Sequence, residues 1–130
     1  MNQYHNFHLQ LLKQTYNQLI TYPPFNQQEL LPQEQSFLDD FEALIEQCQS
    51  FSADYIESGQ GFCIHWIRSY SELNPLLPRD LLWFFSGDCL HYMPDDEINQ
   101  FQRLDELRFE AESKDLAFDY PKHRAIIFNL

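Results

Sequence analysis

Apolar side chains recur through the first part of the chain with the spacing of an amphipathic helix. Within residues 4–20 they follow one another at intervals close to three or four positions, which places them on one helix face. They are Tyr4, Phe7, Leu11, Leu12, Tyr16, Leu19 and Ile20. Pro23 and Pro24 end this pattern, because proline lacks an amide hydrogen and disfavours helical backbone in the residue before it. The pattern predicts a helix over residues 4–20, followed by a connector over residues 26–35.

Residues 36–57 carry the clearest helical pattern in the sequence. At 100° per residue, nine apolar side chains fall within an arc of about 140°, and acidic side chains occupy the opposite side. Ser36 is a plausible N-cap, with Asp39 at the position of a capping-box carboxylate, and Ser58-Gly59 offers a C-terminal stop. We therefore expect one helix of about six turns with a buried stripe. The stripe contains Phe37, Leu38, Phe41, Leu44, Ile45, Cys48, Phe51, Tyr55 and Ile56.

The middle of the chain combines ambiguous and strongly apolar patterns. Residues 61–73 fit both an alternating strand and a helix, and the longer helical match favours helix, with a turn following at residues 74–78. Residues 80–93 have apolar side chains on every side, which is typical of a central helix covered by its neighbours.

The last third of the chain predicts one further helix and a tail. Pro94 is followed by three carboxylates, which favours the first turn of a helix running to about Ser113. We expect residues 116–130 to dock as a strand or an extended segment. Together these elements predict an all-α fold, a single domain over residues 1–130 with four or five helices. Residues 36–57 and 80–93 would form the spine of this bundle.

The charge of the chain narrows the classes of partner. Twenty acidic and eight basic side chains give a formal net charge of −12, which opposes contact with nucleic acids and anionic membrane surfaces. No apolar run approaches the ~20 residues of a membrane span. Three cysteines and the absence of a secretory signal favour a soluble protein of the reducing cytoplasm. Homodimerisation through a leftover apolar stripe remains open.

One segment within residues 83–97 combines side chains that could carry chemistry. Asp88 and His91 are three residues apart, so on a helix they share a face, and a carboxylate that orients an imidazole can support acid–base catalysis. Trp83 and Tyr92 would complete a ligand pocket around them. The alternative is a structural pair that satisfies its own hydrogen bonds inside the core. His5 and His8 have no neighbouring carboxylate or thiol in the sequence, so we expect both to face solvent.

A metal site and a nucleotide cofactor are both disfavoured by spacing. Cys-x-His occurs at Cys63 and at Cys89, but residues two apart lie on different faces of a helix and cannot share a zinc ion. We expect no metal and treat the thiols as buried side chains. The chain has three glycines and no phosphate-binding glycine motif, so we also expect no cofactor.

Acidic side chains dominate the interval between Lys13 and Arg68, which contains no lysine or arginine. They could form a solvated helix face that keeps the protein soluble, or a docking surface for a basic partner. The docking hypothesis would make the protein an interaction or adaptor protein, and in a more specific form a DNA mimic or an immunity-type inhibitor that covers a basic site. The candidate partner-binding side chains are Asp39, Asp40, Glu42, Glu46, Asp54 and Glu57.

Residues 80–98 read Asp-Leu-Leu-Trp-Phe-Phe-Ser-Gly-Asp-Cys-Leu-His-Tyr-Met-Pro-Asp-Asp-Glu-Ile. This string resembles a segment of small uncharacterised bacterial proteins and covers about a seventh of the chain. The resemblance implies no activity.

Overall fold

The computed structural model describes residues 3–130, and all of the regular structure in this range is helical. The all-α prediction is therefore confirmed. Six α-helices and two short 3-10 helices follow one another along the described residues, and the helix beyond the expected five lies in the C-terminal tail. In chain order they are α1 (Gln3–Leu19), α2 (Pro32–Ser50), α3 (Tyr55–Ser69), η1 (Ser71–Leu76), α4 (Arg79–Phe85), η2 (Gly87–Tyr92), α5 (Asp95–Ser113) and α6 (Tyr120–Ile127).

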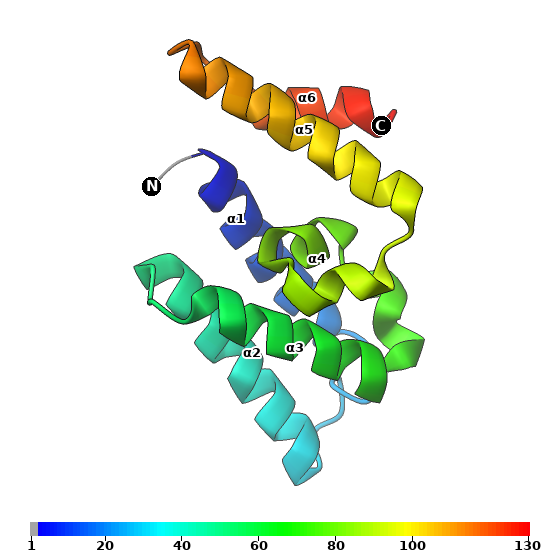
Figure 1. Cartoon of the computed structure of the whole chain (residues 1–130). Coiled ribbons are helices and arrows are strands. Elements are labelled where there is room, and N and C mark those ends of the chain that lie inside the picture. The colour runs from blue at the N-terminus through cyan, green and yellow to red at the C-terminus, as the bar shows by residue number, and fades with distance from the viewer. Residues whose placement is uncertain (1–2) are drawn as a thin grey trace.

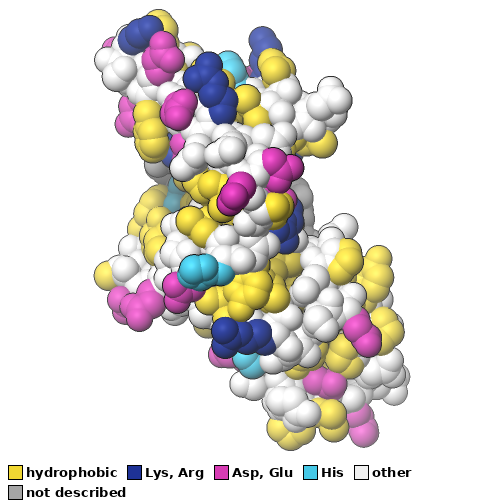
Figure 2. Space-filling model, turned by 45° about the vertical axis from the view of Figure 1, so that its right-hand side comes forward, with side chains coloured by type: hydrophobic (Ala, Val, Ile, Leu, Met, Phe, Trp, Pro, Cys, Tyr) yellow, Lys and Arg dark blue, Asp and Glu magenta, His cyan; other side chains and the backbone are white. Residues whose placement is uncertain are grey.

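The helices form two parts, which we call the helical body and the upper layer. The helical body runs from α1 to η2, and its α2 and α3 pack side by side below α1 and α4 (Figure 1). The upper layer consists of α5 and α6, which pack on each other across the top of the molecule. The space-filling view narrows between the two parts (Figure 2). No helix within residues 3–130 has the length and apolar character needed to cross a membrane.

The prediction of one helix over residues 36–57 is wrong, because the chain turns at Phe51. This residue adopts a left-handed conformation with φ 54°, and its ring stacks on His5 of α1 with centroids 3.9 Å apart. The amides of Phe51 and Ser52 both donate to the carbonyl of Gln47, which closes the end of α2. A contact from another helix therefore stabilises a backbone state that is uncommon for phenylalanine.

The two ends predicted for that helix are also corrected. Helix α2 begins at Pro32, and the Glu34 carboxylate accepts a hydrogen bond from the Leu31 amide at 2.9 Å, so neither Ser36 nor Asp39 caps it. Ser58-Gly59 lies inside α3 instead of ending a helix. A Cβ on Gly59 would lie 2.1 Å from Cδ1 of Phe85, so glycine is required here for close packing of α3 and α4.

The predicted central helix over residues 80–93 is broken at Ser86 and Gly87, which both have positive φ. Gln60 of α3 donates to the carbonyl of Phe85 at 2.8 Å and so satisfies the last turn of α4. A Cβ on Gly87 would meet the Gln60 side chain at 2.5 Å. As expected, α4 is buried, but η2 turns outward after the break.

The C-terminal tail forms helix α6 and no strand. Pro121 occupies its first turn, and the Asp119 side chain accepts from the Lys122 amide at 3.2 Å. Both features are typical of a helix start. The segment 61–73 is helical up to Ser69 and continues into η1, so the favoured helical interpretation is confirmed over most of its length.

Candidate functional site

Asp88 and His91 lie together on the surface of η2. Asp88 Oδ1 and His91 Nε2 are 3.8 Å apart, and the two side chains are 83% and 81% exposed. The pair is therefore fully hydrated, and water competes with any interaction between the two groups. The candidate catalytic residues do meet, but outside the apolar surroundings that would tune them for catalysis.

Trp83 and Tyr92, the other proposed pocket residues, make contacts elsewhere. The indole of Trp83 donates to Asp105 at 2.9 Å and stacks on Phe101, so it is directed toward α5. The hydroxyl of Tyr92 accepts from Arg68 at 3.2 Å. None of the five cavities described along the molecule is lined by Trp83, Asp88, His91 or Tyr92.

The three cysteines are free and buried. Burial raises the pKa of the Cys48 thiol to about 12. Contact with the Cys89 thiol, together with burial, raises the pKa of Cys63 well above its ordinary value. The histidines of the two Cys-x-His pairs, His65 and His91, are exposed, so each is turned away from its cysteine. Within residues 3–130, no three His, Cys, Asp or Glu side chains are grouped to hold a metal ion.

The six candidate partner-binding carboxylates are all exposed, and two helices carry them. We call this set the acidic surface. Asp39, Asp40, Glu42 and Glu46 lie on α2, Asp54 precedes α3, and Glu57 lies in the first turn of α3. On α2, Asp39, Glu42 and Glu46 fall within an arc of about 60°, and Asp40 lies about 100° from Asp39.

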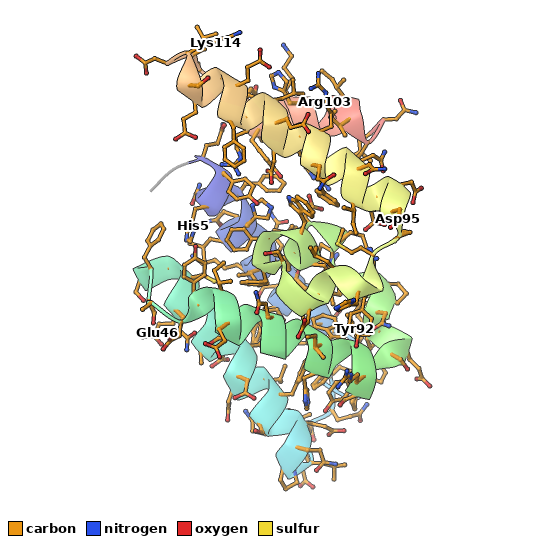
Figure 3. The ribbon with its side chains drawn as sticks, viewed as in Figure 1. His5, Glu46, Tyr92, Asp95, Arg103 and Lys114 are labelled. Carbon is orange, nitrogen blue, oxygen red and sulfur yellow. The ribbon has the colours of Figure 1, made fainter. Side chains whose placement is uncertain are left out.

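The acidic surface has no cationic neighbour among the described residues. Its carboxylates accept hydrogen bonds from neutral donors: Tyr16 donates to Glu42 at 2.5 Å, and Gln35 donates to Asp39 at 2.9 Å. Burial and the hydrogen bond to Glu42 raise the pKa of Tyr16 to about 12, so this hydroxyl stays protonated as a donor. The lowest part of the molecule in Figure 2 shows acidic groups and no basic one. Glu46 lies on the body, and Arg103 and Lys114 lie on the upper layer (Figure 3).

A shallow hollow of about 430 Å³ lies within the acidic surface. Ile45 supplies an apolar side chain to it, and Glu42 and Glu46 supply carboxylates; Gln49 and Ser50 complete its lining. Long basic side chains combine an apolar stem with a charged head, so this lining suits lysine or arginine.

A buried polar cluster joins the helical body to the upper layer, and no sequence pattern predicted it. Asp80 of α4 is 4% exposed and accepts two hydrogen bonds from Arg124 of α6, at 2.6 and 2.8 Å. This bidentate geometry is the strongest form of an arginine–carboxylate pair. The hydrogen bond to Asp80 raises the pKa of Arg124. Forty-four positions separate the partners, so no local pattern could have paired them.

The predictions for His5 and His8 are wrong, because both imidazoles are buried. His5 Nε2 donates to the carbonyl of Cys48 at 2.7 Å, and His8 Nδ1 donates to the carbonyl of Tyr4 at 2.7 Å. His8 stacks on Phe84 with centroids 4.5 Å apart, and its Nε2 has no hydrogen-bond partner. Burial lowers the pKa of His8 to about 4, so the ring is neutral at pH 7.

The tyrosines beside His8 complete this cluster. Tyr4 contacts Tyr120 edge to face, and the guanidinium of Arg108 lies 3.7 Å above the Tyr4 ring. Burial raises the pKa of both tyrosines above the ordinary value. At neutral pH the rings of His8, Tyr4 and Tyr120 are neutral and lie beside the Asp80–Arg124 ion pair, an arrangement that holds α1, α4 and α6 together.

The fold and this charge distribution define an acidic all-α protein with six exposed, unpaired carboxylates on α2 and around the start of α3. A family match that covers residues 1–129 shows that the chain belongs to the PA2817-like family. This match confirms the resemblance to a family of uncharacterised proteins that residues 80–98 first indicated, and it brings no activity with it. Comparisons with curated proteins and with solved structures found no match.

Proposed function

We propose that the protein is a non-enzymatic interaction protein that binds a basic protein partner through its acidic surface. The observation that carries the proposal is the contrast in charge pairing. Six exposed carboxylates have no cation within 4 Å, whereas every ion pair among the described residues involves side chains from Arg79 to Arg124.

Unpaired surface carboxylates repel one another and reduce the stability of the folded chain slightly. A basic partner relieves this repulsion on binding and is attracted over distances of about a Debye length, 8 Å at physiological salt. The net charge of −12 adds to the same attraction. These effects favour rapid association that weakens as salt rises.

The hollow beside Glu42 supports a specific contact within this surface. A lysine or arginine of the partner would lay its stem against Ile45 and direct its charge to Glu42 and Glu46. Tyr16 donates to one oxygen of Glu42 and so orients that carboxylate. The proposal therefore assigns the central contact to α2.

Capture of partners from lysate with two charge-matched variants tests the proposal. The first variant, D39N/E42Q/E46Q, neutralises the α2 part of the acidic surface. The second, E106Q/E110Q/E112Q, removes the same charge from α5, outside that surface. We expect basic proteins bound by the wild type to be lost from the first variant, retained by the second, and released by high salt. Capture that both variants lose equally, or that salt does not affect, contradicts the proposal.

A further inference from the structure

A cleft of about 270 Å³ lies where α4, α5 and the end of the chain meet, and the acidic surface does not contribute to it. We call it the α4–α6 cleft. Its volume is just below the range of about 300–1,000 Å³ typical of small-molecule pockets, so it suits a compact ligand. Its lining residues are Arg79, Asp80, Glu97, Gln100, Phe101, Arg124, Phe128 and Leu130.

The polar side of the cleft contains N–H donors that its own carboxylates do not use. Arg124 uses Nε and Nη2 on Asp80, and Arg79 uses Nε on Glu97 at 2.7 Å and Nη2 on the Tyr92 carbonyl at 2.6 Å. The Nη1 groups of both arginines have no hydrogen-bond partner among the described residues. Each guanidinium carries five N–H donors, so several remain for an acceptor from outside the protein.

These donors are open to solvent. The Arg79 side chain is 45% exposed and the Arg124 side chain is 26% exposed. Asp80 and Glu97 balance the two positive charges, so the cleft has no net charge from these four groups. Both of these carboxylates are already paired with an arginine, and salt screens the more distant acidic residues.

The opposite side of the cleft is aromatic. The rings of Phe101 and Phe128 are in contact, with centroids 4.6 Å apart, and Phe101 is 2% exposed. The Arg124 guanidinium carbon lies 5.9 Å from the Phe128 ring centre. A short molecule can therefore contact the aromatic ring and the guanidinium together.

We propose that the α4–α6 cleft binds a small organic carboxylate with an apolar or aromatic body. The carboxylate accepts hydrogen bonds from the free N–H groups of Arg79 and Arg124, because guanidinium and carboxylate match in geometry. The apolar body packs on Phe128. The unused donors belong to two charged guanidinium groups, so we expect a carboxylate to bind more tightly than an amine of the same size.

Phenylacetate is a suitable probe, in amide chemical-shift titrations of the full chain. We expect saturable shifts at residues 97–101 and 124–130, with weaker or no binding of phenylacetamide and phenethylamine. R79Q should weaken phenylacetate binding about threefold to tenfold, because it removes one charged donor from a partly exposed site. R103Q removes the same charge from α5 outside the cleft and should leave the affinity unchanged.

A second variant separates ligand binding from structural damage. E97Q removes the negative charge that competes for Arg79, so we expect tighter phenylacetate binding, whereas a distorted cleft would weaken it. E106Q provides the charge-matched control and should have no effect. No saturable shift at millimolar phenylacetate, equal binding of phenylacetamide, or weaker binding by E97Q would each overturn the proposal.

Discussion

The helical body and the upper layer are stabilised in different ways. The body contains most of the fully buried large side chains, and no ion pair is formed among its residues 3–78. The upper layer buries few apolar side chains of its own, chiefly Phe101, Leu104 and Tyr120. It attaches through polar contacts, including Asp80–Arg124, Trp83–Asp105 and Arg79–Glu97. Apolar packing thus dominates one part, and directional polar contacts position the other.

The two parts also differ in their excess of acidic charge. Residues 1–93 carry 11 acidic and three basic side chains, and residues 94–130 carry nine acidic and five basic ones. In the upper layer, Asp105, Glu106 and Glu110 pair with arginines and a lysine close by. In the body, α2 and α3 have no such neighbours. The part that is held together mainly by apolar packing therefore carries the larger excess of acidic charge.

The largest expected effect is the loss of apolar packing in the body. Phe41 is fully buried and contacts Tyr16, Phe62 and Trp66. We expect F41A to reduce the free energy of unfolding by about 3–5 kcal/mol, because it removes a buried ring and leaves a cavity. Chemical denaturation monitored by circular dichroism measures this change.

F109A is the matched control, since Phe109 is 54% exposed on α5. Its expected cost is below about 1 kcal/mol. Equal losses from the two variants would show that the body does not contain the dominant apolar core.

The next effect is a pH dependence at the junction of the two parts. Burial lowers the pKa of His8 to about 4, below the value of 6.5 expected when the chain is unfolded. Between these pH values the unfolded chain binds the proton and the folded chain does not. Stability is therefore expected to fall as pH decreases from about 6.5 to 4, by roughly 3 kcal/mol from this group.

H8F tests this dependence directly. Phenylalanine keeps an aromatic ring against Phe84 and cannot be protonated. We expect denaturation midpoints measured across this pH range to vary less in H8F than in the wild type. An unchanged pH profile would assign the acid sensitivity to other groups.

The sequence predicted the elements that local patterns specify. The spacing in residues 4–20 predicted α1, and Pro94 with its three carboxylates predicted the start of α5. The sequence did not predict the breaks at Phe51 and Ser86. Both are non-glycine residues with positive φ, and both lie close to contacts from other helices, which no local pattern shows. Asp119 and Pro121 are local signals for the start of α6. The prediction of a strand or an extended segment relied instead on the apolar residues at the end of the tail.

The candidate sites show the same division between features set by local patterns and features set by distant contacts. Exposure of the acidic side chains follows from the amphipathic pattern, although their division between two helices does not. Burial of His5 and His8 depends on Phe51 and Phe84, which approach α1 from elsewhere in the fold. The α4–α6 cleft requires Asp80 and Arg124 to meet across 44 positions. A single sequence contains no short-range pattern for either arrangement.

The smallest expected effect compares two ion pairs that join the parts. The Asp80 side chain is 5% exposed and bound at two points by Arg124, whereas Glu97 is 22% exposed and its partner Arg79 is 45% exposed. We expect D80N to cost about 2–3 kcal/mol of unfolding free energy, because it leaves the partly buried Arg124 without its countercharge. E97Q should cost less than about 1 kcal/mol, since water and salt already weaken that pair. Thermal unfolding at low and high salt measures the loss of stability in both variants. An equal loss of unfolding free energy in E97Q and D80N would contradict this expectation. It would mean that the exposed Arg79–Glu97 pair attaches the upper layer as firmly as the buried Asp80–Arg124 pair.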